Sequence, residues 1–172
     1  MPSPARDRRE GSGKRPSKRK DIHERALGLL AVRQRSSREL ERRLVQAGFE
    51  PEAVADELDR LEQVGLLDDE AFARAVVESR MGVRGESRRV VAGKLAQAGV
   101  ASEVAMVALD EAPEAEEDRA RRLAEAKAPR LSGLEPQVAM QRLYGFLARR
   151  GYGPEVARDA ARKALAAETV DE

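Results

Sequence analysis

Most of the side chains that could bind a ligand are basic, and they recur at three places along the chain. A guanidinium group can donate paired hydrogen bonds to a phosphate or a carboxylate, so a row of arginines can bind nucleic acid, an acidic protein surface, or both. We expect one continuous basic groove, formed on three equivalent helices and in the turns before them by Arg33, Arg35, Arg38, Arg42, Arg43, Arg80, Arg84, Arg88, Arg89, Lys94, Arg142, Arg149 and Arg150. The alternative is a set of solvated helix faces with local Glu–Arg pairs, each stabilising by roughly 0.2–0.5 kcal/mol.

The aspartate pair Asp68–Asp69 is the other feature that could be reactive. In the stretch GLLDDEAFARAVVESR, which begins at Gly65, it follows a glycine that ends one helix and precedes the apolar residues of the next. A carboxylate at that position accepts hydrogen bonds from the free N–H groups of the first helical turn. Two carboxylates could also hold a metal or act as an acid–base pair, but no histidine or further acid is arranged to help them. We therefore expect one of the two to cap the helix.

Catalysis finds little support in the remaining side chains. The single histidine, His23, lies in a first helical turn beside Asp21 and Glu24, where a surface or capping role is expected. The sequence contains no Ser–His–acid set, metal-ligand cluster or phosphate-binding glycine loop. It also contains no cysteine, which excludes disulfides, thiolate zinc sites and a cysteine nucleophile. We predict a protein that is not an enzyme and that uses no cofactor or metal.

The composition favours helices over strands. Only 3% of the 172 residues are aromatic and none is Trp, so the core must consist of Leu, Val and Ala. Ala, Glu, Arg and Leu dominate, and all four are good helix formers. No apolar run approaches the length of about 18 residues that spans a membrane, and no secretory signal follows the first basic residues. We expect a cytoplasmic protein without a membrane segment.

A sequence repeat positions the basic residues. The stretches LVQAGFEPEAV (44–54), LAQAGVASEVA (95–105) and LARRGYGPEVA (147–157) align on Gly48, Gly99 and Gly151. Each copy is too small to bury a sufficient core alone, so neighbouring copies must share apolar surface. The fold prediction is all-α, with three tandem three-helix repeats in an elongated, curved array. We expect a disordered basic tail (1–20), repeats at 21–67, 68–112 and 113–167, and a disordered end (168–172).

Helix starts and stops within the first repeat can also be predicted. Ser36 and Glu39 match a capping box, in which each side chain satisfies the other residue's free backbone N–H. Val64 is expected to face the core from the last helix of that repeat, and Leu66 and Leu67 to pack against its final turn. The best loops are 80–87 and 128–136.

Charge is sorted by helix position. Acidic residues concentrate on the third helix of the first repeat, which carries Glu52, Asp56, Glu57, Asp59 and Glu62 against Arg60. A helix-turn-helix protein would place that helix in the major groove, where phosphates repel acidic side chains. Sequence-specific duplex recognition is therefore disfavoured. Residues 1–20 carry eight basic and two acidic residues, which fits either a solubilising extension or an electrostatic arm for nucleic acid or an acidic partner.

A family resemblance adds to these observations. The pattern Gly65-Leu66-Leu67-Asp68-Asp69-x-x-Phe72-Ala73, followed by Arg80, a Gly/Arg-rich turn and Leu95-x-x-x-Gly99-Val100, resembles the central part of the RecX regulatory family. SSRELERRLVQAGF resembles that family's first unit and LYGFLARRGYGPEVARDA its last, so the resemblance covers roughly residues 22–166.

The resemblance implies three tandem three-helix repeats and a non-enzymatic modulator of the RecA recombinase. Such a protein binds RecA and its filament on single-stranded DNA, and inhibits ATP hydrolysis and strand exchange in DNA repair, recombination and the SOS response. We expect a monomer with weak direct DNA binding. Whether it caps filament ends or lies in their groove, and whether it sometimes stimulates RecA, stays open. The alternatives are a non-sequence-specific DNA-binding helical protein and a helical scaffold for another partner.

Overall fold

The chain forms a succession of short helices. The computed structural model describes residues 18–168, and within that range no strand occurs. The α-helices are α1 (Lys18–Val32), α2 (Ser37–Gln46), α3 (Pro51–Gln63), α4 (Asp69–Val77), α5 (Arg88–Ala98), α6 (Ser102–Asp110), α7 (Glu116–Lys127), α8 (Pro136–Ala148) and α9 (Pro154–Glu168). The predicted basic tail and C-terminal end lie outside the described residues, except that α1 already begins at Lys18 and α9 continues to Glu168.

Three separate apolar clusters hold the helices in groups of three. The first joins α1–α3, the second α4–α6 and the third α7–α9. The leucine that precedes each aligned glycine by four residues, Leu44, Leu95 or Leu147, is fully buried in its own cluster. The all-α prediction of three tandem three-helix units is therefore confirmed. The third cluster is built mainly of alanines, which lets α7 and α9 approach each other closely.

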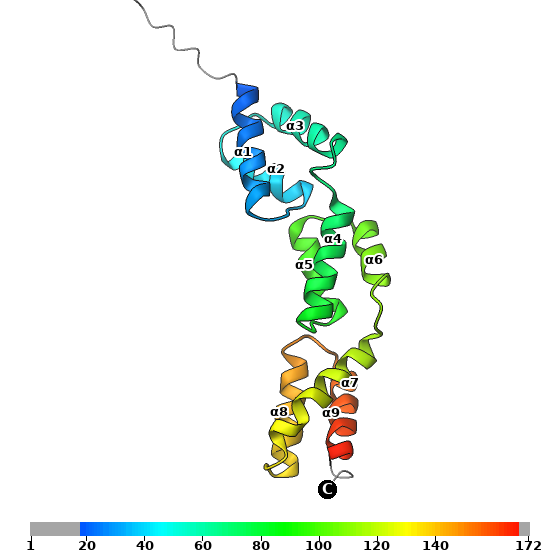
Figure 1. Ribbon diagram of the computed structural model, residues 1–172. Coiled ribbons are helices and arrows are strands. Elements are labelled where there is room, and N and C mark those ends of the chain that lie inside the picture. The colour runs from blue at the N-terminus through cyan, green and yellow to red at the C-terminus, as the bar shows by residue number, and fades with distance from the viewer. Residues whose placement is uncertain (1–17, 169–172) are drawn as a thin grey trace, which may run out of the picture.

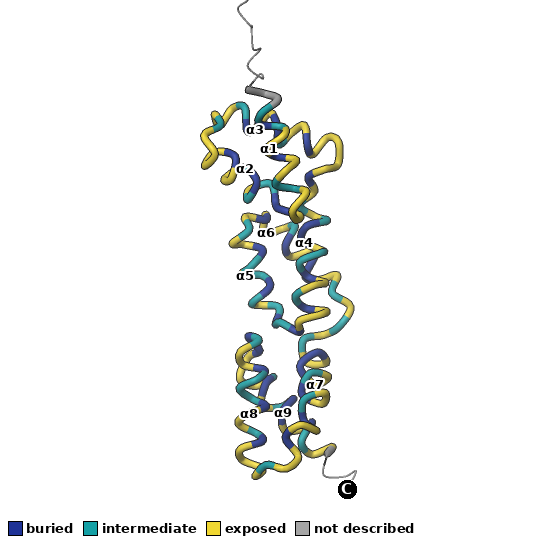
Figure 2. Tube along the Cα trace, turned by 60° about the vertical axis from the view of Figure 1, so that its left-hand side comes forward, coloured by how far each residue is buried: buried dark blue, intermediate teal, exposed yellow. Residues whose placement is uncertain are grey.

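The three units follow one another in an elongated array (Figure 1). The middle helices α2, α5 and α8 succeed one another along one side of it, as Figure 2 shows most clearly. The three helices that carry these predicted basic residues therefore follow one another on the same side of the array. Buried residues line the interior of each three-helix unit, and exposed residues cover its outside (Figure 2).

Two expectations about loops and one about the core need correction. The predicted loop 80–87 begins inside a π-helical turn, Glu78–Val83, that continues α4, and the predicted loop 128–136 begins inside a 3₁₀ turn, Ala128–Leu131. Both turns extend a helix with residues whose side chains, such as Met81 and Leu131, are buried. Val64 is exposed, because it follows the last packed turn of α3 as its C-terminal cap.

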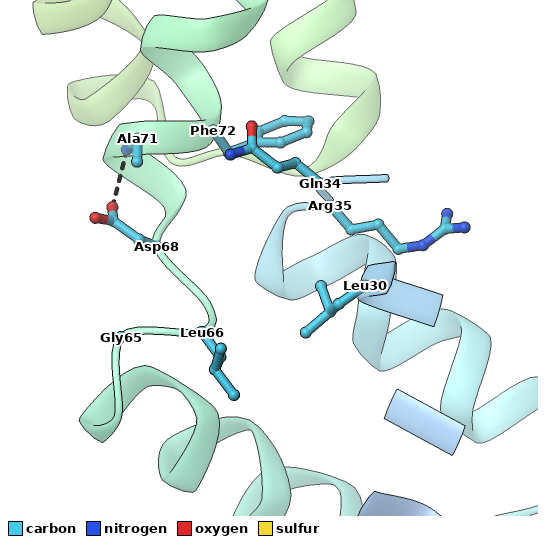
Figure 3. A pocket seen from close by; sticks show the side chains of 8 residues that line it. All are labelled: Leu30, Gln34, Arg35, Gly65, Leu66, Asp68, Ala71 and Phe72. Carbon is cyan, nitrogen blue, oxygen red and sulfur yellow. Dashed lines mark hydrogen bonds between the residues drawn. The ribbon is translucent and has the colours of Figure 1, made fainter. Parts of the chain in front are cut away.

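The junction of units one and two uses both aspartates. Asp68 accepts a hydrogen bond from the backbone N–H of Ala71 at 2.9 Å, so it caps α4 as predicted (Figure 3). Asp69 accepts a hydrogen bond from the backbone N–H of Ser37 at 2.7 Å and ties the start of α4 to the start of α2. Of the two leucines expected to pack against α3, Leu67 is buried in the first apolar cluster, as predicted, but Leu66 is not. It is 53% exposed and lines a hollow of about 180 Å³ beside Asp68 (Figure 3).

A joint connects α2 to the end of α5. The hydroxyl of Ser36, which is fully buried, donates a hydrogen bond to the backbone carbonyl of Ala98. The next residue, Gly99, has a φ of 81° and lies so near α2 that a Cβ there would be 2.5 Å from the Cβ of Arg38. Glycine is the residue that tolerates both this backbone conformation and this approach.

Equivalent residues form the joint between units two and three. The backbone N–H of Ser87 donates to the carbonyl of Arg150 at 2.9 Å. A Cβ on Gly151, whose φ is 90°, would lie 2.3 Å from Cγ2 of Val90. In both joints the residue that caps a middle helix contacts the carbonyl before the glycine of the next unit. This repeated contact sets the middle helices in line.

Tyr152 adds a buried polar contact to the second joint. Its hydroxyl donates a hydrogen bond to the carbonyl of Gly85 at 3.0 Å. Burial raises the pKa of Tyr152 to about 12, although nearby Arg119 opposes that rise. The neutral phenol is therefore the form that the folded protein accommodates.

We expect the stability that Tyr152 contributes to be constant below pH 10 and to fall as the pH rises toward 12. Over that interval the unfolded chain ionises its tyrosine at the ordinary pKa, whereas the folded chain resists ionisation. Tyr152→Phe loses about 1 kcal/mol at neutral pH, for the missing hydrogen bond. Urea unfolding of both proteins from pH 8 to pH 12 should show this difference shrinking above pH 10. A difference that does not change with pH would mean that the phenol is not buried.

Candidate functional site

A hollow between units one and two brings three of the predicted groove residues together. It measures about 580 Å³ and lies between α2, α4 and α5. Arg33, Arg80 and Lys94 line it, with Phe72 and Val76 among its apolar residues. The predicted basic residues of different units thus share one hollow, as a continuous groove requires.

In unit one, a single carboxylate that lines this hollow, Glu39, contacts three of the predicted arginines. Glu39 accepts hydrogen bonds from Arg33, at 2.5 Å, and from Arg35, and lies 3.6 Å from Nε of Arg43. Burial raises the pKa of Glu39, but Arg33 and Arg35 outweigh it, so the pKa lies below its ordinary value. The Ser36 hydroxyl accepts the N–H of Glu39 at 3.1 Å, which confirms the Ser36 half of the predicted capping box. The carboxylate of Glu39 contacts Arg33, Arg35 and Arg43 instead of the backbone N–H of Ser36.

We expect Glu39→Gln to destabilise the protein by about 1 to 2 kcal/mol at pH 7, because charge-assisted hydrogen bonds are lost. The pKa of Glu39 is lowered on folding, so its contribution is present above the unfolded pKa and lost as the pH falls through the folded pKa. The two proteins should therefore converge in acid. Thermal unfolding from pH 3 to pH 7 measures this.

The matched control for Glu39→Gln is Glu41→Gln. Glu41 accepts a hydrogen bond from Arg38 at 2.7 Å in a more exposed pair three residues apart on α2. Such pairs contribute about 0.5 kcal/mol or less. Equal losses for the two variants would contradict the central role of Glu39.

Unit two also neutralises much of its positive charge. Glu86 lies 3.2 Å from Arg80 and 3.5 Å from Lys94, and Asp110 lies 2.6 Å from Arg88.

Arg35 is buried in unit one and donates to the carbonyl of Leu29, which leaves it little surface for a partner. Local pairs with carboxylates, the alternative to a binding groove, thus neutralise many of the predicted basic residues in units one and two.

The remaining predicted residues form no ion pair with any residue in the described range: Arg42, Arg84, Arg89, Arg142, Arg149 and Arg150. Half of them belong to unit three. Arg42 donates to the carbonyl of Gln97 at 3.4 Å across the first joint, and Arg150 donates to the carbonyl of Arg84 at 3.4 Å across the second. The unneutralised positive charge is thus concentrated toward the third unit.

Unit three has its own hollow, of about 450 Å³, beside α8. Lys127, Arg142, Arg149 and Phe146 line it, together with Leu131 and Gln141. Lys127 and Phe146 are not among the residues predicted from the sequence. The sequence nevertheless carries a signal for Phe146, because Arg142, Phe146 and Arg149 stand at positions i, i+4 and i+7 of one helix and so share a face.

Acidic side chains cover a different part of unit one. On α3, Glu52, Asp59 and Glu62 are exposed. Glu57 is buried, and its carboxylate lies 2.5 Å from Nδ1 of His23. The single histidine therefore links α1 to α3, and its observed contact is structural. Among residues 18–168, no group of three or more His, Asp or Glu side chains could hold a metal ion.

Comparisons with known proteins identify the family. Family models described as the first, second and third three-helix domains of RecX match residues 23–61, 68–109 and 114–161. The chain is 36% identical over 176 residues to the regulatory protein RecX of Thermobifida fusca, covering 99% of this chain and 95% of that protein. The chain belongs to the RecX family. Its relative from Mycolicibacterium smegmatis is 44% identical over 147 residues, covering 83% and 78% of the two chains.

Solved structures carry the same fold. A crystal structure of RecX from Lactobacillus salivarius superposes with a TM-score of 0.70 at 18% identity, covering 85% of this chain and 96% of that one. A second crystal structure, of a regulatory protein RecX, gives a TM-score of 0.63 at 22% identity over 80% of this chain and 68% of that one. RecX is a family of regulatory proteins. No helix among residues 18–168 is long and apolar enough to cross a membrane.

Proposed function

We propose that this RecX protein binds the RecA recombinase and its filament on single-stranded DNA, and inhibits ATP hydrolysis and strand exchange. It would thereby modulate recombinational DNA repair and the SOS response without being an enzyme. The observation that carries the proposal is family membership along nearly the whole chain, with each three-helix domain matched in order. The unit boundaries at 67/68 and 112/113 are part of the same proposal.

The mechanism that we favour is steric and electrostatic. A filament presents the same surface again and again, and an elongated array of repeats can contact neighbouring subunits at once. The helices α2, α5 and α8 lie along one side of the array (Figure 2), and seven of the thirteen proposed contact residues belong to them. Binding there would bias adjacent RecA subunits toward an inactive, disassembling state.

The direct test is RecA ATP hydrolysis on single-stranded DNA, titrated with the protein at fixed moderate salt. Loss of the rate at far fewer molecules of the protein than of RecA supports end capping or filament collapse. Loss that needs one molecule per few nucleotides, and that excess DNA relieves, supports the alternative of a non-sequence-specific DNA-binding protein. No effect at any ratio would remove RecA as the partner.

Charge reversal on α2 tests the proposed surface. We expect replacement of Arg38, Arg42 and Arg43 by Glu to weaken binding to the RecA filament at least tenfold, measured by fluorescence anisotropy with labelled protein. The control is Arg74→Glu with Arg121→Glu and Arg162→Glu, which reverses the same number of exposed arginines on first and third helices. If both triple variants bind equally well, the middle-helix side is not the contact surface.

A further inference from the structure

The hollow on unit three differs from the one between units one and two in its charge balance. No carboxylate side chain lines it, whereas Glu39 belongs to the lining of the other. Lys127, Arg142 and Arg149 form no ion pair with a described residue. Three cations that face one hollow without internal counter-ions repel each other, and a bound anion relieves that repulsion.

An aromatic ring lies among these cations. Phe146 is only partly buried, and the guanidinium of Arg150 stacks on its ring with the central carbon 3.9 Å from the centroid. The ammonium of Lys127 is 5.8 Å from the same centroid, at the end of a flexible side chain. The Arg150 guanidinium also donates long hydrogen bonds to the carbonyls of Phe146, at 3.5 Å, and Arg84, at 3.4 Å. The ring is therefore held in position beside the hollow.

The spacing along α8 places the ring between two free guanidinium groups. Arg142 precedes Phe146 by four residues and Arg149 follows it by three, so the two arginines are roughly 10 Å apart along the helix axis. Proteins that bind single-stranded nucleic acids without sequence preference combine these parts, namely cations that track the phosphates and an aromatic ring on which a base stacks.

We infer that the hollow lined by Lys127, Arg142, Phe146 and Arg149 binds a single strand of nucleic acid, with phosphates on the two arginines and a base against Phe146. An acidic polypeptide would also satisfy the cations, but it would make no use of the ring between them. Any role of this strand in a RecA filament rests on the proposed function. Binding of single-stranded DNA without RecA does not rest on it, so this inference and the proposed function can fail separately.

The test measures affinity for a short labelled oligothymidylate without RecA, by fluorescence anisotropy with the full chain. Phe146→Leu keeps an apolar side chain in the core but removes the aromatic face, and we expect it to weaken binding roughly tenfold. The same variant should bind an abasic oligomer of equal length as tightly as the native protein does. Circular dichroism confirms that the helices are intact.

Phosphate contacts are tested separately by salt dependence. Arg142→Gln combined with Arg149→Gln should weaken binding to both oligomers and lower the slope of log affinity against log salt by roughly 1.4, about 0.7 per lost contact. The matched control, Arg121→Gln with Arg162→Gln, removes two charges from the same unit at residues that pair with Asp118 and Asp159. The control should leave the slope unchanged.

Three results would overturn the inference. One is the absence of measurable binding of the native protein to the oligomer at low salt. Another is a Phe146→Leu protein that binds the base-containing oligomer as tightly as the native chain does. The third is a poly-glutamate peptide of equal charge that displaces the labelled oligomer as effectively as unlabelled oligothymidylate does. That result would assign the hollow to an acidic protein.

Discussion

Gly151→Ala is expected to destabilise the protein by about 3 kcal/mol. An L-residue in the left-handed conformation that Gly151 adopts costs about 1 to 2 kcal/mol. The added Cβ would also meet Cγ2 of Val90 at 2.3 Å and Oγ of Ser87 at 2.7 Å. Valine on a helix is confined largely to one rotamer, so Val90 cannot turn away. Overpacking of this kind costs a further 1 to 3 kcal/mol or so.

The control for this variant is Gly48→Ala, at the equivalent position of the first unit. Gly48 has the same φ of 90° as Gly151, but no atom outside its own turn lies within 4 Å of an added Cβ. We expect this variant to lose only about 1 to 2 kcal/mol, for the backbone alone. Urea unfolding of the two variants gives the difference, which isolates the contact between units two and three. Equal losses would mean that the joint is loose in solution.

The repeat in the sequence was sufficient to predict the fold. Leu44, Leu95 and Leu147 recur with the aligned glycines, and each is buried where the pattern places it. Apolar residues that recur at helical spacing share one face of a helix, so their burial can be predicted from the sequence alone. The joints could not be predicted in this way. They depend on which residues of one unit lie opposite those of the next, and Gly48 and Gly151 are alike in sequence although only Gly151 is packed against a neighbour.

For a similar reason, the sequence could not show which of the predicted site residues are neutralised by a carboxylate and which are not. The sequence gives their charge and their helix face, but the carboxylates that neutralise them come partly from other elements. Asp110, on α6, pairs with Arg88 at the start of α5, twenty-two residues away. Glu39 gathers arginines from the α1–α2 turn and from α2 itself, so it takes up charge that the sequence assigned to a partner. Phe146 cannot be told from a core residue in the sequence, because an aromatic residue on a helix is usually largely buried.

Ser36→Ala is expected to cost about 2 to 4 kcal/mol, since one hydroxyl of a fully buried residue makes two hydrogen bonds. As the N-terminal cap of α2 it accepts the N–H of Glu39, and loss of a cap costs about 1 kcal/mol. It also donates to the carbonyl of Ala98 across the first joint. Alanine would leave that part-buried carbonyl without its donor, which costs about 1 to 3 kcal/mol.

Ser87→Ala is the comparison that isolates the joint. Ser87 caps α5 through its hydroxyl, which accepts the N–H of Val90 at 3.4 Å, but it reaches the next unit through its backbone N–H. Alanine keeps that N–H, so only the cap is lost and the cost should be about 1 kcal/mol. Urea unfolding at neutral pH measures both variants. If Ser87→Ala proves as damaging as Ser36→Ala, the hydrogen bond from the Ser36 hydroxyl to Ala98 adds nothing to the stability of the first joint beyond the helix cap.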